Sequence, residues 1–197
     1  MTRSNGGDRN FDDLTEKFSR KVYGGLKGEI RLAVIWRDLM SVIPEINISK
    51  PMRVLDVGGG LGQMSIKLAE LGHRVTYNDI SSNMLAIAKD SAVKAGVESF
   101  IEWRQCAYQD LDVEELGQFD LILCHAMIEW LDKPKQLIPK LMRHRSPNGF
   151  ISLTFYNHNA LVYRNLIRGN FKMLESEFKA DAGSLTPHTP FEPDLIR

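Results

Sequence analysis

Hydrophobic positions along this chain follow two alternating periods, and their order predicts strands and helices in turn. Short apolar runs rich in β-branched residues and bounded by glycine, proline or polar clusters are typical of buried strands. Such runs occupy residues 52–57, 74–78, 99–104, 119–125 and 150–156. Apolar residues with helical spacing lie between these runs, at 64–70, from Ser81 to Gly96 and around 134–142. This rhythm predicts parallel strands joined by helical crossovers, that is, a doubly wound α/β sheet.

The segments before and after this core are predicted to be helical. Apolar spacing from Phe11 to Val22 predicts one helix, and the spacing from Ile30 to Ile43 predicts a second, so two helices precede the first strand. After the fifth strand we expect helices at 158–168 and 171–179, followed by a proline-rich tail and no further strand. Residues 1–9 are polar and carry two glycines, so we expect a disordered leader there and a single domain over 10–197.

Composition limits the possible classes of protein. A chain of 197 residues with 43% hydrophobic content can form one α/β domain with a substantial core. Its 25 basic and 25 acidic residues balance, so binding to nucleic acid would need a local patch. Cys106 and Cys124 lie in apolar surroundings without metal-ligand spacing, which predicts free thiols, no metal and a reducing compartment. Without a long apolar segment or signal-peptide pattern, we expect a cytoplasmic protein that does not span a membrane.

The most informative stretch is a glycine-rich loop between the first predicted strand and the helix after it. Glycine allows a positive φ and a close approach of the backbone to a ligand. A dinucleotide-binding loop has the pattern G-x-G-x-x-G. Here Gly58 and Gly60 supply the first two positions, but Gln63 stands where the third is due. The loop therefore favours a cofactor without a pyrophosphate, and a plain strand-to-helix turn is the alternative.

Asp79 stands at the end of the second predicted strand, next to that loop in the predicted sheet. A carboxylate there can accept hydrogen bonds from the two hydroxyls of a ribose. The alternative is that Asp79 only begins the turn into the following helix.

Several segments together resemble known families. Val54–Gly62, Asn78–Asp79 and Ala107–Asp110 resemble the successive cofactor motifs of class I S-adenosylmethionine-dependent methyltransferases. Over about residues 9 to 190 the chain resembles the tRNA 5-carboxymethoxyuridine methyltransferase family. The segments that carry this resemblance are Arg9–Asp13, Glu16–Arg20, Tyr23–Gly24, Lys27–Gly28, His125–Trp130 and Phe155–Asn157. The resemblance implies a Rossmann-like methyltransferase sheet with N-terminal helices. It also implies transfer of a methyl group from S-adenosylmethionine to the carboxylate of 5-carboxymethoxyuridine at the tRNA wobble position.

The resemblance also implies a set of cofactor contacts, namely Arg31, Gly58, Gly59, Asp79, Tyr108, Gln109 and His125. Arg31 could pair with the cofactor carboxylate or be an ordinary solvated helix charge. Gln109 could receive the adenine amino group, whereas Asp110 beside it could be a helix cap. His125 is expected to position a group rather than act as a base, because a carboxylic acid is already ionised at neutral pH. A core histidine is the alternative, and Trp130 could be core or could stack on a base.

Basic and aromatic residues near the carboxyl ends of the strands are candidates for contact with a tRNA anticodon loop. They are Arg20, Tyr23, Lys27, Tyr156, Arg164 and Arg168, with Lys21, Lys172 and Tyr163 nearby. Solvated surface charges are the alternative for each of them.

One feature departs from the methyltransferase pattern. The class I fold normally ends with an antiparallel hairpin of strands six and seven, and no such strands are predicted here. We therefore expect a domain truncated at its C-terminal end. Two other functions remain open: a small-molecule carboxyl or oxygen methyltransferase on the same scaffold, and a cofactor-binding module without activity. The oligomeric state is not predicted.

Overall fold

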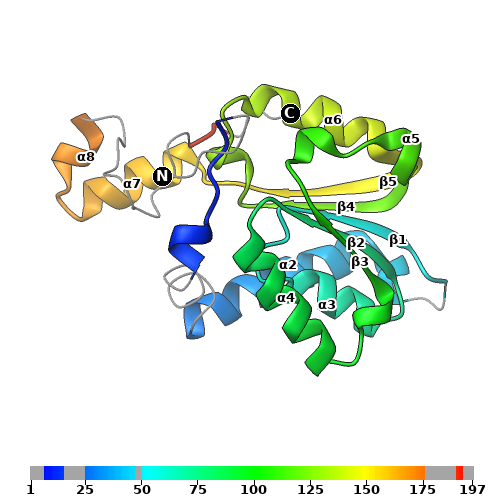
Figure 1. Ribbon diagram of the computed structural model, residues 1–197. Coiled ribbons are helices and arrows are strands. Elements are labelled where there is room, and N and C mark those ends of the chain that lie inside the picture. Colours follow the sequence, from blue (N-terminus) through cyan, green and yellow to red (C-terminus); the bar gives the residue numbers. More distant parts are fainter. Residues whose placement is uncertain (1–6, 16–24, 48–49, 176–189, 193–197) are drawn as a thin grey trace.

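The computed structural model describes residues 7–15, 25–47, 50–175 and 190–192 and contains a five-stranded parallel sheet. The strands are β1 (Arg53–Val57), β2 (Arg74–Asp79), β3 (Ile101–Gln105), β4 (Phe119–His125) and β5 (Arg145–Thr154). Their order is β3-β2-β1-β4-β5, and every neighbouring pair is parallel (Figure 1). The order reverses between β1 and β4, and ligands of such sheets bind outside the carboxyl ends at that point. The predicted doubly wound sheet is confirmed.

Helices cover both faces of the sheet (Figure 1). One face carries α2 (Leu26–Val42), α3 (Gln63–Glu70) and α4 (Ser82–Lys94), which pack with β1 and β2 around Tyr77 and Leu68. The other face carries α5 (Val113–Leu116) and α6 (Leu137–His144), which pack around Phe119 and Leu137. Leu39 of α2, Leu68 of α3 and Leu137 of α6 are buried against the sheet, and burial of apolar surface of this kind holds the three layers together.

Short 3-10 turns and two further helices complete the described chain. The turns are η1 (Asp12–Leu14), η3 (Pro44–Asn47), η4 (Glu98–Phe100), η5 (Tyr108–Asp110), η6 (Ile128–Trp130) and η7 (Pro134–Gln136). After β5, α7 (His158–Ile167) and α8 (Phe171–Glu175) extend away from the sheet (Figure 1). Phe191 pairs with Asn157 in an isolated bridge beside the start of α7.

Most predicted elements are confirmed with small shifts at their ends. The largest shift is in β5, which begins at Arg145 rather than Phe150. The chain from Ser146 to Gly149 forms an irregularity inside the strand, and the Arg145 guanidinium donates to the carbonyl of Gly149 at 2.9 Å. β3 begins late because residues 98–100 form a turn.

The terminal helices are tested only in part. Within 11–22 the structure describes one 3-10 turn at 12–14, and 16–24 lies outside the described residues. The helix expected over 171–179 is seen as far as Glu175, while 176–189 and 193–197, which contain most of the proline-rich tail, lie outside.

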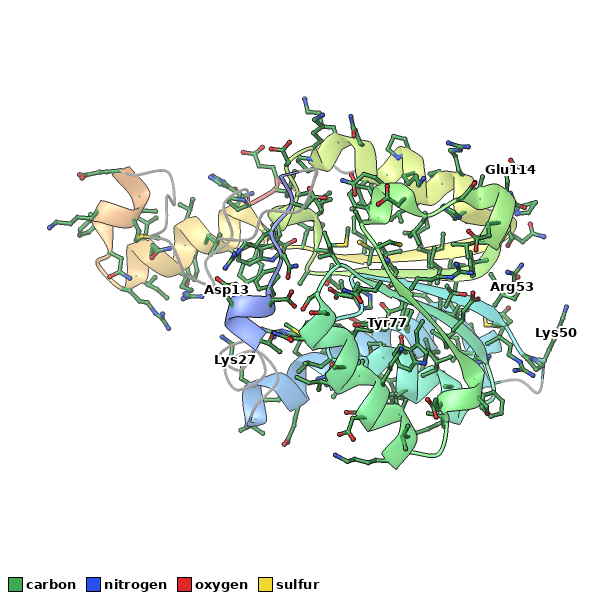
Figure 2. All side chains as sticks on the ribbon, viewed as in Figure 1. Asp13, Lys27, Lys50, Arg53, Tyr77 and Glu114 are labelled. Carbon is green, nitrogen blue, oxygen red and sulfur yellow. The ribbon has the colours of Figure 1, made fainter. Side chains whose placement is uncertain are left out.

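The two ends of the sheet differ in how they are closed. At the amino ends of the strands, the buried His73 accepts the Met52 amide at Nδ1 (3.1 Å), and its Nε2 lies 2.9 Å from the Ile46 carbonyl. Figure 2 shows Lys50, Arg53 and Glu114 at this end, and Asp13 and Lys27 at the opposite one. The carboxyl ends of the strands lie on the side of Asp13, and a binding site is expected there.

Candidate functional site

The glycine-rich loop closes against the sheet on one side and is open on the other. Gly58 and Gly60 have φ of 68° and 55°, values that side chains other than glycine rarely adopt. A Cβ on Gly58 would lie 2.6 Å from the Met127 sulfur, and one on Gly59 would lie 2.6 Å from the Tyr77 ring. A Cβ on Gly60 would meet nothing within 4 Å. The loop therefore needs glycine for packing at its back and offers bare backbone at its front.

Asp79 ties this loop to the end of β2. Its Oδ2 accepts the Gly60 amide at 2.9 Å, and its Oδ1 accepts the Ser81 amide at 2.8 Å. Burial raises the pKa of the Asp79 carboxyl, against the effect of these bonds. Each carboxylate oxygen can accept more than one hydrogen bond. The carboxylate thus keeps acceptor capacity for the adjacent hydroxyls of a ligand.

A second carboxylate lies behind the loop. Asp56 in β1 is buried and accepts the Ser65 hydroxyl at 2.6 Å. Burial raises the pKa of Asp56 to about 6. Because its partner belongs to the first turn of α3, Asp56 fixes the helix that follows the loop and does not itself line the cavity described next.

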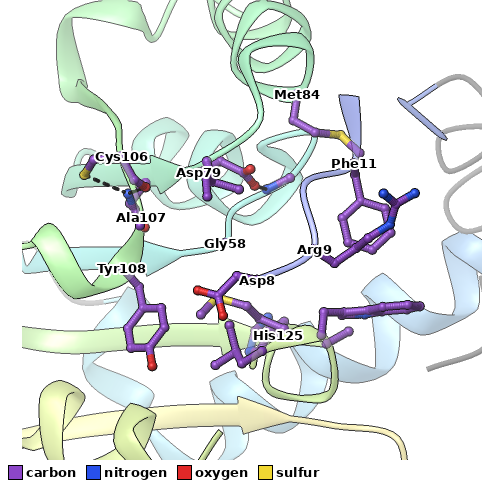
Figure 3. Close-up of a pocket in the computed structure, with 17 residues that line it drawn as sticks. Asp8, Arg9, Phe11, Gly58, Asp79, Met84, Cys106, Ala107, Tyr108 and His125 are labelled. Atoms are coloured by element: carbon purple, nitrogen blue, oxygen red, sulfur yellow. Dashed lines mark hydrogen bonds between the residues drawn. The ribbon is translucent and has the colours of Figure 1, made fainter. Parts of the chain in front are cut away.

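A cavity lies in front of the loop at the carboxyl ends of the strands (Figure 3). Its wall includes Gly58 and Gly60 of the loop, Asp79 from β2, Tyr108 after β3 and His125 from β4. The predicted place of the site, at the reversal of strand order, is where this cavity lies.

His125 and Ala126 form the part of the wall at the end of β4. The Nε2 atom of His125 lies 2.9 Å from the Ser152 hydroxyl oxygen on β5. Burial lowers the pKa of His125 to about 4, so its imidazole is neutral at physiological pH. Ala126 has a φ of 54°, and its amide donates to the Thr154 carbonyl at 2.9 Å. A strained backbone held by such a bond is common at functional sites.

Residues Gly7–Thr15, here called the N-terminal strap, cross the cavity. At one end Asp8 is buried: its Oδ2 accepts from Gln109 Nε2 at 2.7 Å, and its Oδ1 accepts the Asp132 amide at 2.9 Å. The Arg9 amide donates to the Trp130 carbonyl at 3.1 Å, and Asp8, Arg9 and Phe11 line the cavity. The leader expected over 1–9 therefore differs from the structure at residues 7–9, whereas 1–6 lie outside the described residues.

The other end of the strap is fixed on the start of α4. One carboxylate oxygen of Asp12 accepts from the Ser81 hydroxyl at 2.6 Å and from the Asn83 amide at 3.1 Å. Asn83 Nδ2 also donates to the Asp12 carbonyl at 3.0 Å. Burial opposes ionisation of Asp12, but the hydrogen bonds outweigh it and lower its pKa below the usual 3.8. Figure 3 shows the chain from Asp8 to Phe11 running between the Met84 and His125 sides of the cavity.

We expect Asp12→Asn to lower the free energy of unfolding by about 1 kcal/mol at pH 7, because the substitution weakens charge-assisted hydrogen bonds. The folded-state pKa of Asp12 is depressed, so its contribution is present above pH 3.8 and is lost as pH falls through the folded-state value. Urea unfolding at pH 7 and pH 3 measures this difference. Asp13→Asn is the control, because Asp13 is exposed and, among the described residues, its carboxylate pairs with the neighbouring Arg9. Equal effects of the two variants at pH 7 would contradict this role of Asp12.

The residues expected to contact a cofactor divide into two groups. Gly58, Asp79, Tyr108 and His125 line the cavity. The others lie outside its lining: Gly59 packs on Tyr77, Gln109 bonds to Asp8, and Arg31 is half-buried on α2. The hydroxyl of Tyr108 is buried and has no hydrogen-bond partner among the described residues, and burial raises its pKa to about 12. A buried polar group of this kind is one that a ligand can satisfy.

The candidates for substrate contact lie farther out. Arg20 and Tyr23 fall outside the described residues. Lys27 is exposed in the first turn of α2, Arg164 and Arg168 are exposed on and just after α7, and Tyr156 is half-buried after β5. The structure does not bring these four into the cavity lining.

Glu129 is a feature whose burial the sequence did not indicate. It lies in η6, between cavity-lining Met127 and Trp130, and is only 1% exposed. Neither carboxylate oxygen has a hydrogen-bond partner in the part of the chain that the structure describes. Burial raises the pKa of Glu129 to about 7. A carboxyl group with a pKa this close to neutrality is more frequent at functional sites than elsewhere.

Residues 7–15, 25–47, 50–175 and 190–192 contain neither a cluster of metal-ligating side chains nor a membrane-spanning helix. Within these ranges no three His, Cys, Asp or Glu side chains gather in a way that could hold a metal ion. No helix in the same ranges is both long and apolar enough to cross a membrane. Cys106 and Cys124 are free thiols, and the second is buried.

Comparison with known proteins shows the family and the fold of the chain. Residues 55–153 match the model of a methyltransferase domain family. The tRNA 5-carboxymethoxyuridine methyltransferase of Escherichia coli strain K12 is 42% identical over 190 residues, which are 96% of this chain and 72% of that protein. A ubiquinone biosynthesis O-methyltransferase of Xanthomonas axonopodis is 30% identical over 117 residues, 59% of this chain and 48% of that protein.

A solved structure from Pyrococcus horikoshii OT3 has the same fold. It superposes with a TM-score of 0.61 over 78% of this chain and 66% of that one, at 22% identity. The glycine loop and the order of the strands are consistent with the 42% identity to the Escherichia coli protein over 96% of this chain. This chain belongs to the tRNA 5-carboxymethoxyuridine methyltransferase family.

Proposed function

We propose that this protein transfers the methyl group of S-adenosylmethionine to the carboxylate of 5-carboxymethoxyuridine at the wobble position of tRNA, giving the methyl ester. The observation that carries the proposal is the 42% identity to the Escherichia coli enzyme over 96% of this chain. The cavity at the carboxyl ends of β1, β2 and β4 provides a place for the cofactor.

The residues around the cavity fit this cofactor. The Asp79 carboxylate, held by two backbone amides, keeps acceptor capacity for the two ribose hydroxyls. Bare backbone at Gly60 leaves room beside it, and the Tyr108 hydroxyl offers a further polar contact. When bound, S-adenosylmethionine supplies a methyl group on a positively charged sulfur.

The chain's own contribution to the reaction is orientation and exclusion of water. No general base is needed, because a carboxylic acid is ionised at neutral pH. His125 is neutral, so it can hold a hydrogen bond to a carboxylate without taking a proton. Phe11, Met127 and Trp130 line the cavity with apolar surface, and Phe11 packs edge-on against Trp130 at 4.9 Å between ring centroids. Alignment of nucleophile and methyl group in a dry site is what this kind of displacement requires.

The tRNA is proposed to bind along α7 and α8, beyond the cavity. Arg164 and Arg168 are exposed there together with Lys172 and the aromatic Tyr163 and Phe171. Tyr163 is 67% exposed and Phe171 is 59% exposed. Because the whole chain has no net charge, a local group of cations beside aromatic rings is the kind of surface that a single-stranded loop of RNA can bind.

The double substitution Arg164→Ala with Arg168→Ala is expected to raise the KM for tRNA by about tenfold at low salt. It should also reduce the slope of log KM against log[KCl] by about one to two, because up to two phosphate contacts are lost. The measurement is KM for tRNA over a series of KCl concentrations. Lys50→Ala is the control, because Lys50 is exposed at the opposite end of the sheet (Figure 2). An unchanged salt dependence in the double variant would exclude α7 as the tRNA-binding surface.

Formation of S-adenosylhomocysteine by the purified chain tests the proposed function. We expect product with tRNA that carries 5-carboxymethoxyuridine and none with tRNA lacking it. Product with small carboxylic acids but not with this tRNA would instead indicate a small-molecule methyltransferase. Cofactor binding without product on either substrate would indicate a binding module.

A further inference from the structure

We propose that Ser152 is a positioning residue for His125: its hydroxyl donates a hydrogen bond to Nε2 and keeps the single imidazole proton on Nδ1. The 2.9 Å contact between Ser152 Oγ and His125 Nε2 is the observation behind this inference. The identity of the ligand that His125 would bind rests on the proposed function, whereas the position of the proton on the imidazole ring can be measured without it.

The sheet register brings these two side chains together. His125 pairs with Thr154 and Leu123 pairs with Ser152 across the parallel strands β4 and β5. Successive side chains of a strand alternate between faces, so His125 and Ser152 project from the same face of the sheet. Ser152 also lines a groove beside α2, next to apolar Leu39 and Ile43. Among the described residues no second hydrogen bond of the Ser152 hydroxyl is found, so His125 is its partner.

Only one ring nitrogen of His125 remains for a ligand. Because Nε2 faces Ser152, a contact from the ring to a molecule in the cavity must use Nδ1. A neutral imidazole has one N–H group, and the hydrogen bond at one nitrogen decides which nitrogen carries the proton. A serine hydroxyl can either donate to Nε2, which leaves the proton on Nδ1, or accept from Nε2, which leaves Nδ1 without one. Which arrangement is useful depends on whether the ligand at Nδ1 accepts or donates hydrogen bonds.

The ligand chemistry that fits is a carboxylate. The proposed reaction brings two carboxylates to the cavity, one on the methionine part of the cofactor and one on the nucleoside. Both only accept hydrogen bonds, so a lone pair on Nδ1 would repel them, whereas an N–H group would bind them. Donation by Ser152 to Nε2 selects the form of His125 that presents Nδ1–H.

Two variants of similar shape isolate the hydroxyl. Ser152→Thr keeps an oxygen at the position, whereas Ser152→Val replaces that oxygen with a methyl group, and both residues suit a β-strand. In the free protein, nitrogen-15 NMR of histidine is expected to show the proton of His125 on Nδ1 in the unmodified chain and in Ser152→Thr, and predominantly on Nε2 in Ser152→Val. A proton on Nε2 in the unmodified chain would overturn the proposal, as would an identical spectrum in Ser152→Val.

Binding and kinetics then identify the carboxylate. If it is that of the cofactor, Ser152→Val should weaken S-adenosylhomocysteine about tenfold and leave 5′-methylthioadenosine, which lacks the amino acid part, within about twofold. If it is that of the nucleoside, the KM for modified tRNA should rise about tenfold instead, with the affinity for S-adenosylhomocysteine unchanged. Unchanged values in both assays would overturn the role of Ser152 in carboxylate binding. Failure of the unmodified chain to transfer methyl groups would refute the proposed function, and the NMR result would still decide whether Ser152 sets the proton position of His125.

Discussion

Replacing Asp79 with alanine is expected to weaken binding of S-adenosylmethionine by about 100-fold or more. The substitution removes the acceptor for two ribose hydroxyls, and each hydrogen bond to a charged group contributes about 1.5–3 kcal/mol. It also leaves the Gly60 and Ser81 amides without their carboxylate partner, so the front of the glycine loop loses its anchor on β2. Isothermal titration calorimetry of the purified variant measures the affinity.

The control is Asp90→Ala on α4, whose carboxylate is exposed and, in the part of the chain that the structure describes, pairs with the exposed Lys94. That variant should bind the cofactor as the unmodified chain does. Asp79→Asn should fall between the two, because one amide oxygen can still accept but the amide nitrogen cannot. If Asp79→Ala, with a circular dichroism spectrum like that of the unmodified chain, bound S-adenosylmethionine with less than threefold loss, the cofactor would not lie against Asp79.

Replacing Glu129 with glutamine is expected to stabilise the protein above pH 7. The pKa of Glu129 is about 7 in the folded chain against an ordinary value of 4.5, so the folded state binds the proton more tightly than the unfolded state. Stability is therefore lost as pH rises from about 4.5 to about 7, and the difference between these pKa values corresponds to about 3 kcal/mol. Glutamine does not ionise, so the variant avoids this loss.

Urea unfolding at pH 5 and pH 8 tests this expectation. Glu129→Gln should match the unmodified chain within about 1 kcal/mol at pH 5 and exceed its stability by about 2–3 kcal/mol at pH 8. Glu70→Gln is the control, because Glu70 is an exposed residue at the end of α3 and its replacement should change the free energy of unfolding by less than about 0.5 kcal/mol. A variant that is less stable than the unmodified chain at pH 8 would mean that the Glu129 carboxylate has a stabilising partner when ionised.

The central fold could be predicted because its signals are local. Apolar runs such as Phe119–His125 mark buried strands, and glycines after β1 mark the turn into α3. The place of the site then follows from the reversal of strand order in a parallel sheet. The start of β5 could not be predicted, because Pro147 and Gly149 are typical of turns and here lie in an irregularity held by Arg145.

The site was predictable only where one residue carries its own signal. Gly58 directly follows β1 and Asp79 is the last residue of β2, and the structure places both on the cavity wall. The strap was not predictable, because Asp8 is buried by contacts with Gln109 and Asp132, which are distant in sequence. The alternation of the polar Ser152 and Thr154 in the otherwise apolar run 150–154 was a signal that could have drawn attention to the partner of His125.

The most direct test of methyl transfer to a nucleoside carboxylate uses methyl-labelled S-adenosylmethionine and tRNA that carries unmethylated 5-carboxymethoxyuridine. After reaction with the purified chain, the tRNA is digested to nucleosides and analysed by mass spectrometry. We predict that the label is in the methyl ester of 5-carboxymethoxyuridine, that mild alkali removes it, and that Asp79→Ala incorporates almost none. A labelled methyl group that resists alkali, or an unmodified chain that binds the cofactor but labels no nucleoside, would contradict this assignment.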